Sequence, residues 1–541
     1  MCLKNNTSAY SNLLTINKLN STVNRSANLA IFADMKRTII AMLLLVAITA
    51  TPAAGKVNTK TQQMLRSYMK TPTFEGSLVG VLALGPKGDT LAVMNPSTRL
   101  VPASNMKIIT TGAAFRSLGA DYKFKTELAY SGKIEDGTLK GDLYIVGYGD
   151  PTTASGDSIA LSANALFQSW KGMMVKAGIK RVEGAIVGDG RFYRDMREHL
   201  TWEYADIGTA YGTGWGGLSF YRNKQDFPVT AGAAAGAPVN VKIKYPDTPW
   251  MNFTNRAVTG PAGTGNSLYL YTSDLAPVSE LRGTFAVGRK PKTEEYSNKY
   301  PDLTLAYYFY KFLTKNGVAV TGGPHYIDAD GLLRSDPSQP GILKASDDLK
   351  TIGTSWSPKL ALIAREINHR SDNFYAEALF HSIGLKEMGT AQYDSCVVAE
   401  NRVLKSMLGK AAKGIIVEDG SGLSRHNGVS PEAMVTMLKV MASSPDAAQF
   451  LATLPSPGSP GTLRRIMANT PEADKSRIRM KSGTLDQVVS YSGYILPEGS
   501  EDPAEAVTFC IITNATAASG QTVRAAVLRI IALLLEETKA A

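Results

Sequence analysis

The apolar and polar positions of the N-terminal part predict a helix, a β-hairpin and a second helix. The run "TQQMLRSYMKT" has helical spacing, and "SLVGVLALG" and "TLAVMNP" are apolar runs around the turn signal Pro-Lys-Gly-Asp, as expected for two antiparallel strands. The stretch 101–119, "VPASNMKIITTGAAFRSLG", follows directly and carries few charges. It predicts a helix that is buried on most sides.

From about Tyr122 to Ser355 the pattern changes to short apolar runs separated by glycine and proline. "FKTELAYSGKIEDGTLKGDLYIVG" predicts a hairpin around Glu-Asp-Gly, and "RVEGAIVGDG" and "APVNVKIKYP" are further predicted strands. Only two helices are predicted in this part, near 160–177 and 303–315. We therefore expect a mostly-β region, divided into one or two subdomains.

Helical patterning returns at "SPKLALIAREINHRSDNFYAEALFHSIGL" and continues to about Ala442. Three β-rich runs follow, "RIRMKSGTL", "VVSYSGYIL" and "AVTFCIITNA", and then a last helix, "TVRAAVLRIIALLLEETK". The apolar positions of this helix have the spacing of a core helix, which favours packing on a sheet over membrane contact. A peripheral membrane contact stays open as the alternative.

The overall charge argues against a nucleic-acid partner. The 541 residues carry a formal charge of +11, and beyond Gly55 the balance is 53 basic against 46 acidic residues, or +7. These basic residues are scattered and form no cluster that would follow a phosphate backbone. We expect a mild attraction to anionic surfaces and no nucleic acid, and the sequence leaves the oligomeric state open.

A targeting segment lies 35 residues into the chain. Met35-Lys36-Arg37 precedes the apolar run "TIIAMLLLVAITA" and the small residues of "TPAAG", which is the pattern of a cleaved signal peptide. We predict that translation begins at Met35, that residues 1–34 are not retained, and that cleavage near Ala53 or Ala54 releases the protein into the periplasm. An uncleaved signal anchor is the alternative.

Cysteine and histidine usage gives no support for a disulfide scaffold or a metal centre. Of the three cysteines, Cys2, Cys396 and Cys510, only the last two survive the predicted processing, and we do not assume that they pair. The five histidines show no metal-ligand spacing. We expect neither a metal nor another cofactor.

One charge in the predicted helix at 101–119 points to chemistry. Lys107 follows Ser104 by three positions, so both side chains lie on one face of a helix. An amine held among apolar neighbours loses solvation, its pKa falls, and it can accept the proton of a hydroxyl group. Ser-x-x-Lys alone is a weak signal, because Ser67 and Lys70 form the same pattern in what we interpret as an ordinary helix surface.

Two later motifs strengthen this interpretation. Ser371-Asp372-Asn373 lies between two helical runs, and Lys481-Ser482-Gly483-Thr484 opens a predicted strand. Ser-x-x-Lys, Ser-Asp-Asn and a Lys-Thr-Gly strand in this order are a known signature of penicillin-binding proteins and class A β-lactamases. Taken singly, these residues read as a helix cap, a satisfied polar side chain and an exposed strand charge, but jointly they favour an acylating serine enzyme.

A fourth stretch narrows the resemblance. "DGSGLSRHN" (419–427), together with "SPKLALIAREINHRSDNFYAEAL", "GTLRRIM" and "GDP", resembles the D-alanyl-D-alanine carboxypeptidase/endopeptidase family. These are class C low-molecular-mass penicillin-binding proteins of the penicillin-binding protein 4 type. That family inserts extra domains between its first and second motifs, and here 264 positions separate Lys107 from Ser371, against 108 between Asn373 and Lys481.

The resemblance implies an α+β fold. A serine transpeptidase/β-lactamase-like domain, an antiparallel sheet flanked by helices, would carry the mostly-β insertion. The expected order is a non-retained extension (1–34), a signal peptide (35–54), the first part of the transpeptidase domain (55–121), the inserted domain or domains (122–355) and the second part of the transpeptidase domain (356–541).

The resemblance also implies roles for the motif residues. Ser104 would be the acylated nucleophile and Lys107 its base, Ser371 and Lys481 would pass a proton to the leaving amine, and Asn373 would hold the substrate amide. Ser482, Gly483 and Thr484 would bind the terminal carboxylate of a D-alanyl-D-alanine stem, with β-lactams as covalent inhibitors. A second lysine near Lys107 would lower the pKa of its amine further.

Three residues fall where relatives form a pocket for the diamino-acid side chain of the stem peptide: Asp206, Tyr211 and Arg425. Asp206 would pair a free ammonium group, although a capping or surface role is an equal alternative. Asp486 stands where some relatives have an uncharged amide, which leaves the side-chain preference open.

The leading hypothesis is an exported, penicillin-sensitive serine D,D-peptidase acting on peptidoglycan stem peptides. A β-lactamase or esterase on the same fold is the enzymatic alternative, although Glu-x-x-Leu-Asn after Asn373 and Gly-x-Ser-x-Gly are both absent. A non-catalytic wall-binding protein is the third. The balance between carboxypeptidase and endopeptidase activity is open at this point.

Overall fold

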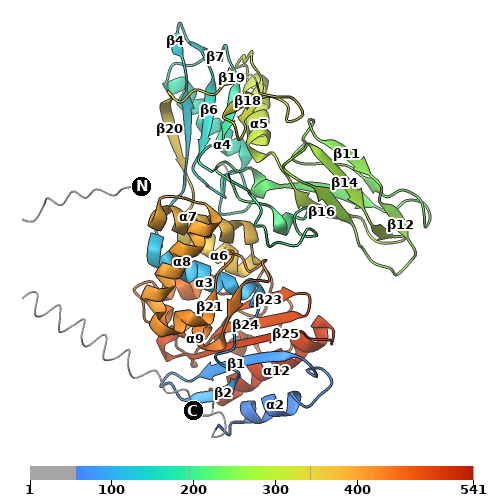
Figure 1. Ribbon diagram of the computed structural model, residues 1–541, viewed down its shortest axis with the longest axis vertical. Helices are drawn as coiled ribbons and strands as arrows, with labels where there is room; N and C mark the ends of the chain where they lie inside the picture. The colour runs from blue at the N-terminus through green and yellow to red at the C-terminus, as the bar shows by residue number, and fades with distance from the viewer. Residues whose placement is uncertain (1–56, 194, 342, 540–541) are drawn as a thin grey trace, which may run out of the picture. The chain divides into compact units, whose positions relative to one another are not determined.

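The computed structural model describes residues 57–193, 195–341 and 343–539 (Figure 1). The predicted signal peptide, the start at Met35 and the extension 1–34 lie outside the described residues.

A five-stranded antiparallel sheet brings together the two ends of the described chain, in the order β2-β1-β25-β24-β23. All eight residues of β24 and all eight of β25 are buried, so both faces of the sheet are covered. The strands are β1 (Leu78–Leu84), β2 (Thr90–Met94), β23 (Ile478–Leu485), β24 (Val488–Ile495) and β25 (Val507–Asn514).

Two terminal helices, α2 (Lys60–Tyr68) and α12 (Gly520–Glu537), cover one face of this sheet (Figure 1). Alternate β25 residues, such as Phe509 and Ile511, share a core cluster with Ile531 of α12, because successive strand residues point to opposite faces. The last helix thus packs on the sheet, as its pattern predicts. Within the described residues, no helix has the length and apolarity needed to span a bilayer.

A helical layer covers the other face, where Cys510 and Ile512 of β25 point. Its innermost helix is the one predicted at 101–119, in which every residue from Met106 to Phe115 is buried. Apolar helix residues surround it on all sides, which explains why it lacks a polar face. The layer consists of α3 (Met106–Leu118), α6 (Leu360–Arg370), α7 (Asn373–Met388), α8 (Tyr393–Leu408), α9 (Pro431–Ala442) and α10 (Ala447–Thr453).

Between α3 and α6 the chain forms a second, mixed sheet of seven strands in the order β19-β18-β17-β8-β6-β3-β20. Apolar residues of α4 (Ala163–Lys176) and α5 (Pro301–Lys315) pack against it in a separate core. Its strands are β3 (Lys125–Tyr130), β6 (Leu143–Gly147), β8 (Ile186–Asp189), β17 (Pro324–Ile327), β18 (Leu332–Arg334), β19 (Leu343–Lys344) and β20 (Lys350–Trp356).

Smaller sheets between 224 and 297 enclose a core of their own. The strand predicted in "APVNVKIKYP" is present but shorter than expected, because only Asn240–Val241 (β10) pairs as a strand and the chain then bonds Asp226 through Lys244 and Tyr245. The strands here are β9 (Lys224–Thr230), β11 (Asn252–Asn255), β12 (Val258–Gly260), β13 (Tyr269–Thr272), β14 (Val278–Arg282), β15 (Thr284–Ala286) and β16 (Lys292–Ser297).

Short elements complete the described chain. The predicted Glu-Asp-Gly hairpin is formed by β4 and β5. These elements are β4 (Lys133–Glu135), β5 (Thr138–Lys140), β7 (Arg181–Val182), β21 (Ile415–Ile416), β22 (Gly428–Val429), α11 (Glu472–Arg477), and the 3-10 turns η1 (Ala103–Asn105), η2 (Ala210–Gly212), η3 (Tyr221–Asn223), η4 (Gly409–Gly414) and η5 (Pro503–Glu505).

Candidate active site

Ser104 lies in the 3-10 turn η1 that leads into α3. The turn begins at Ala103, a buried non-glycine residue with a positive φ of 48°. The neighbouring Asn105 amide donates to the Lys481 carbonyl oxygen at 3.0 Å and accepts from the Ser492 hydroxyl at 2.9 Å. These bonds fix the serine turn against β23 and β24.

Lys107 is fully buried one turn further on. Its Nζ donates to the Ser104 hydroxyl at 3.0 Å, to the Asn373 side-chain oxygen at 2.6 Å and to the Ser421 carbonyl oxygen at 2.6 Å. Burial lowers the pKa of the amine to about 8, and nearby carboxylates oppose this shift. The amine therefore changes charge close to neutral pH, within hydrogen-bonding distance of the serine oxygen.

Ser371 and Asn373 lie at the junction of α6 and α7. Ser371 ends α6 in the left-handed conformation, with φ 60° and ψ 41°, and Asp372 caps α7 by accepting from the Tyr375 N–H. The Asn373 amide nitrogen donates to the Tyr211 carbonyl oxygen of η2 at 2.9 Å. Asn373 therefore connects two parts of the molecule. Its side-chain oxygen accepts from Lys107, and its nitrogen donates to the stretch of chain between α3 and α6.

Lys481 is the second buried amine. Its Nζ donates to the Ser371 hydroxyl at 3.0 Å and to the Ser482 carbonyl oxygen at 2.5 Å. Burial lowers its pKa well below the ordinary value, and the positive charge of Lys107 lowers it further. The effect expected for Lys107 from a neighbouring lysine is therefore seen on Lys481, whereas at Lys107 nearby carboxylates counteract the lowering of the pKa.

The strand β23 passes directly over the serine turn. A Cβ atom at Gly483 would lie 2.8 Å from the Pro102 carbonyl oxygen and 3.0 Å from the Ser104 nitrogen, so only glycine permits this approach. Ser482 is half-buried and Thr484 exposed, alternating with buried Lys481 and Gly483. The exposed edge of β23 is thus open beside Ser104.

The three predicted pocket residues lie in two hydrogen-bonded pairs, whose fourth member is Glu203. The Tyr211 hydroxyl donates to Asp206 at 3.0 Å. Arg425 pairs with Glu203 at 2.6 Å and donates to the Asp486 carbonyl oxygen at 3.1 Å. Burial raises the pKa of Asp206. The negative charge of Glu203 raises this pKa further, and the positive charge of Arg425 lowers it. Glu203 was not foreseen, because an exposed acid next to the exposed Tyr204 gives no sequence signal.

Sequence reasoning also missed the support behind Lys107. The Ser421 carbonyl oxygen that accepts from Lys107 is held in place by Glu377 of α7, whose carboxylate accepts from the Ser421 N–H at 2.8 Å and the Gly420 N–H at 3.3 Å. Burial raises the pKa of Glu377 to about 8. A lone acid in the apolar run "NFYAEALFHSIGL" is the same kind of signal as Lys107 in its helix, and it was available from the sequence.

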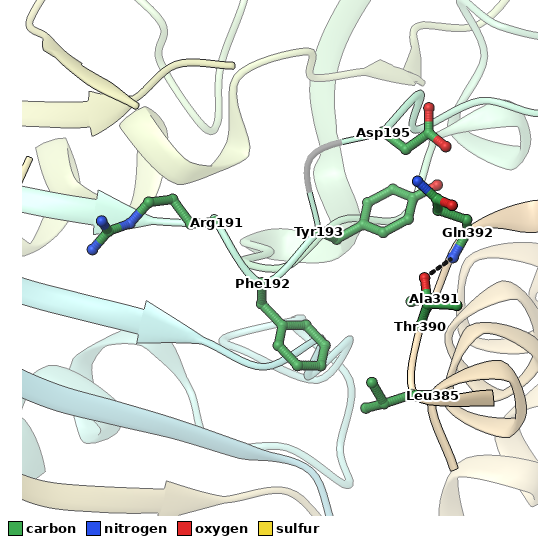
Figure 2. A pocket seen from close by; sticks show the side chains of 9 residues that line it. Arg191, Phe192, Tyr193, Asp195, Leu385, Thr390, Ala391 and Gln392 are labelled. Atoms are coloured by element: carbon green, nitrogen blue, oxygen red, sulfur yellow. Dashed lines mark hydrogen bonds between the residues drawn. The ribbon is translucent and has the colours of Figure 1, made fainter. Parts of the chain in front are cut away.

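A pocket of about 450 Å³ lies elsewhere, at the end of α7 opposite Asn373 (Figure 2). None of the predicted site residues lines it. Its walls are Arg191, Phe192, Tyr193, Asp195, Leu385, Gly389, Thr390, Ala391 and Gln392.

Cysteines and metal-ligand groups play no part in this arrangement. Cys396 and Cys510 are both buried and unpaired with each other. The described part of the chain contains no group of three or more His, Cys, Asp or Glu side chains placed to hold a metal ion. The chemistry available at the site is that of two serine hydroxyls, each hydrogen-bonded to a buried amine of lowered pKa, which is suited to acyl transfer.

Solved structures define the class of the fold. Penicillin binding protein 4 from Haemophilus influenzae aligns with a TM-score of 0.71 at 23% identity, covering 89% of this chain and 99% of that one. The same protein complexed with a novel β-lactam aligns with a TM-score of 0.67 at 22% identity, with the same coverage. The fold is therefore that of a penicillin-binding protein, and the predicted fold class is confirmed.

Sequence comparison identifies the family. The model of the D-Ala-D-Ala carboxypeptidase 3 (S13) family matches residues 61–534, so the chain belongs to this family. It is a serine-type D,D-peptidase, as the motifs predict.

Two curated relatives agree with this assignment. The D-alanyl-D-alanine carboxypeptidase of Actinomadura sp. (strain R39) is 29% identical over 474 residues, covering 85% of this chain and 82% of that protein. The D-alanyl-D-alanine carboxypeptidase DacB of Haemophilus influenzae is 25% identical over 436 residues, covering 78% of this chain and 83% of that protein.

Proposed function

We propose that this enzyme is exported and acts on peptidoglycan stem peptides through an acyl-enzyme on Ser104. It removes the terminal D-Ala, cleaves D-Ala cross-links, or does both. The observation that carries this proposal is the pair of buried amines, each 3.0 Å from a serine hydroxyl: Lys107 from Ser104, and Lys481 from Ser371.

Acylation begins with transfer of the Ser104 hydroxyl proton to the neutral amine of Lys107. A pKa of about 8 leaves roughly one amine in ten neutral at pH 7. The serine oxygen bonds to the carbonyl carbon of the penultimate D-Ala, and the resulting oxyanion is held by the backbone N–H groups of Ser104 and Thr484. Each such donor lowers the barrier by about 3–4 kcal/mol in other acyl transfers.

Collapse of this intermediate breaks the C–N bond to the leaving D-Ala or cross-linked amine. That nitrogen takes a proton from the Ser371 hydroxyl, which is replenished by Lys481. Lys107 passes the proton that it took from Ser104 to Lys481, so both amines return to their starting state. Water then attacks the ester carbon and gives its proton to the neutral Lys107 amine, which returns it to the Ser104 oxygen as the ester bond breaks. The products are the shortened peptide acid and free Ser104, and no cofactor is consumed.

The substrate is positioned by β23 and by the Tyr211 side of the site. Ser482, Gly483 and Thr484 bind the terminal carboxylate together with the positive charge of the lysine pair. Tyr211, paired with Asp206, contacts Asn373, and Arg425, paired with Glu203, contacts Asp486 just after β23, so both charge signs are offered. This arrangement suits a diamino-acid side chain, with Asp206 facing its ammonium group.

β-Lactams acylate the same oxygen in this proposal. The fold shared with a penicillin binding protein 4 that has been complexed with a β-lactam supports it. A β-lactam carries its carboxylate and amide carbonyl in one rigid ring system, so it meets the same donors as a D-Ala-D-Ala end.

The test is to incubate the purified protein with pentapeptide monomers and cross-linked muropeptide dimers, beside Ser104→Ala, and to read the products by mass. We expect D-Ala loss, dimer cleavage or both from the wild type and neither from the variant. Penicillin labelling without any product would refute the peptidase assignment. Rapid, repeated nitrocefin hydrolysis would instead favour a β-lactamase.

The periplasm is the proposed location, because the substrate lies outside the cytoplasmic membrane and the pattern after Met35 is that of a signal peptide. N-terminal sequencing of the exported protein should give a start near Ala54 or Gly55. A retained apolar segment would favour a signal anchor.

A further inference from the structure

Three successive non-glycine residues of the η3 turn are left-handed. Tyr221, Arg222 and Asn223 have φ values of 52°, 57° and 51°. L-residues avoid this region because Cβ crowds the carbonyl oxygen, and single residues rather than runs are the rule. Such a backbone persists only where its surroundings hold it, and it is concentrated at functional places.

The surroundings of the turn do hold it. The Asn223 side chain accepts from the Phe220 N–H at 3.2 Å and donates to the Gly214 carbonyl oxygen at 3.0 Å. The Tyr221 hydroxyl donates to Asp226 at 3.0 Å. With both flanking side chains fixed in this way, the direction of Arg222 between them is fixed as well.

Arg222 points at the second catalytic motif. Its guanidinium forms an ion pair with Asp372 and lies 3.9 Å from Asp157. The three side chains are 19%, 2% and 4% exposed respectively, so this charge cluster is shielded from water and is stronger than a surface pair. Asp372 is the residue between Ser371 and Asn373.

Both oxygens of Asp372 are therefore occupied. One accepts from the Tyr375 N–H at 2.9 Å and starts α7, and the other accepts from Arg222. Asp157 holds the same segment from a second direction, because it accepts from the Tyr375 hydroxyl at 2.6 Å and pairs with Arg370. Arg222 thus holds the middle residue of the motif and Asp157 holds its flanks, and both groups precede α6 by more than a hundred positions.

We propose that Arg222, assisted by Asp157, is a positioning residue that sets the orientation of Ser371 and Asn373. This inference rests on the proposed function. Arg222 does not contact Lys107, Ser104 or the exposed edge of β23 in any hydrogen bond or ion pair of the described residues. It acts through Asp372, by fixing the rotation of the first turn of α7.

The test measures two constants of penicillin acylation in the full chain, the acylation rate constant and the dissociation constant of the initial complex. Arg222→Met should lower the rate constant roughly 100-fold, the loss that a 1 Å misplacement produces, and leave the dissociation constant within about threefold. Arg222→Lys keeps the charge without the planar fork and should recover part of the rate.

Arg191→Met is the matched control. Arg191 is 14% exposed and pairs with Asp189, which is 3% exposed, at the end of β8. It lies at the pocket of Figure 2, on the far end of α7. This variant should lose stability in the same way as Arg222→Met while keeping the wild-type acylation rate.

Several outcomes overturn the proposal. Wild-type acylation by folded Arg222→Met does so, as does an equal loss of rate in Arg191→Met, or a loss confined to the dissociation constant. If Arg222→Met does not fold, Arg222→Lys decides, because full wild-type acylation by that variant removes the need for the guanidinium. Acylation is measured apart from peptide hydrolysis, so failure of the peptidase assay leaves this test intact.

Discussion

The contact between β23 and the serine turn can be perturbed by one methyl group, in Gly483→Ala. The new Cβ would lie 2.2 Å from the Ser490 hydroxyl oxygen, 2.8 Å from the Pro102 carbonyl oxygen and 3.0 Å from the Ser104 nitrogen. The serine side chain can rotate away. The two backbone atoms cannot, so the strand and the turn must separate.

The required separation sets the size of the effect. Restoring ordinary contact distances of about 3.4 Å to both backbone atoms moves β23 away from the serine turn by about half an ångström. That shift displaces one proposed oxyanion donor, Thr484 N–H, relative to the other. Since 1 Å misplacements cost about 100-fold, we expect acylation to slow between about 10- and 100-fold, or about 1.4–2.7 kcal/mol of barrier.

The assay is the time course of labelling by a fluorescent penicillin, with unfolding followed in parallel. Gly172→Ala is the control, because a Cβ on this α4 residue meets no atom within 4 Å, and it should label at the wild-type rate. The double variant Gly483→Ala/Ser490→Ala removes the closest contact and leaves both backbone contacts. It should remain slow.

Two results would refute this reasoning. A wild-type labelling rate in folded Gly483→Ala would mean that the close approach of β23 does not fix the position of Ser104. Full recovery in the double variant would assign the effect to the Ser490 hydroxyl, which donates to Pro102 at 2.7 Å, and not to backbone displacement.

Three further predictions concern buried ionisable groups. Acylation should rise with pH and level off above about 8, since the Lys107 amine acts only when neutral; a flat profile, or acylation by Lys107→Ala, would remove its role as base. Glu377→Gln should slow acylation about 10-fold, because it loosens the Ser421 carbonyl oxygen that accepts from Lys107; a wild-type acylation rate in the folded variant would contradict it. Glu400 is a buried residue of α8. Folded Glu400 keeps its proton to about pH 8 but releases it near 4.5 when unfolded, so it lowers stability by about 1.4 kcal/mol per pH unit in that window. Glu400→Gln should reduce the slope in urea unfolding by about this amount, while Glu377, whose pKa is also raised to about 8, keeps its own contribution; an unchanged slope would refute the assignment.

Much of the fold could be predicted because both faces of the five-stranded sheet are buried. The apolar runs of β1, β24 and β25 therefore stand out from the turns around them. In "APVNVKIKYP" the length of the strand was overestimated. Its alternation of valine, isoleucine and lysine is a local pattern, whereas regular pairing ends after Val241, where single contacts with Asp226 follow. Tertiary contacts of this kind override β-propensity.

The residues of the site likewise fall into those that the sequence could predict and those that it could not. Motif spacing predicted the five residues Ser104, Lys107, Ser371, Asn373 and Lys481. In the structure, Lys107 contacts Ser104 and Asn373, and Lys481 contacts Ser371. The Ser421 carbonyl oxygen was not foreseen, because every residue carries such a group and only its direction matters.

Arg222 was missed for a related reason. Left-handed turns are usually marked by glycine, and "FYRNK" contains none. Its partner Asp372 is 150 positions away in the sequence, so no local pattern relates the two residues.

The pairing of β1 with β25 has a consequence for how the molecule assembles. Leu78 lies opposite Asn514, so the middle of the sheet closes only when the last strand has been synthesised. The buried helix α3 likewise lacks cover until α7 and α9, which follow the intervening region, have been synthesised.

The intervening region removes much of this difficulty. It has its own cores, and its first strand pairs with its last, Lys125 opposite Trp356. Once it has folded, the two halves of the peptidase domain emerge side by side, as if joined by a short loop. Closing a flexible loop of that length would cost about 5 kcal/mol in chain entropy. The folded region thus holds the two halves of the peptidase domain close together. Shortening it without preserving the Lys125–Trp356 pairing would make folding pay the entropy of closing the long loop.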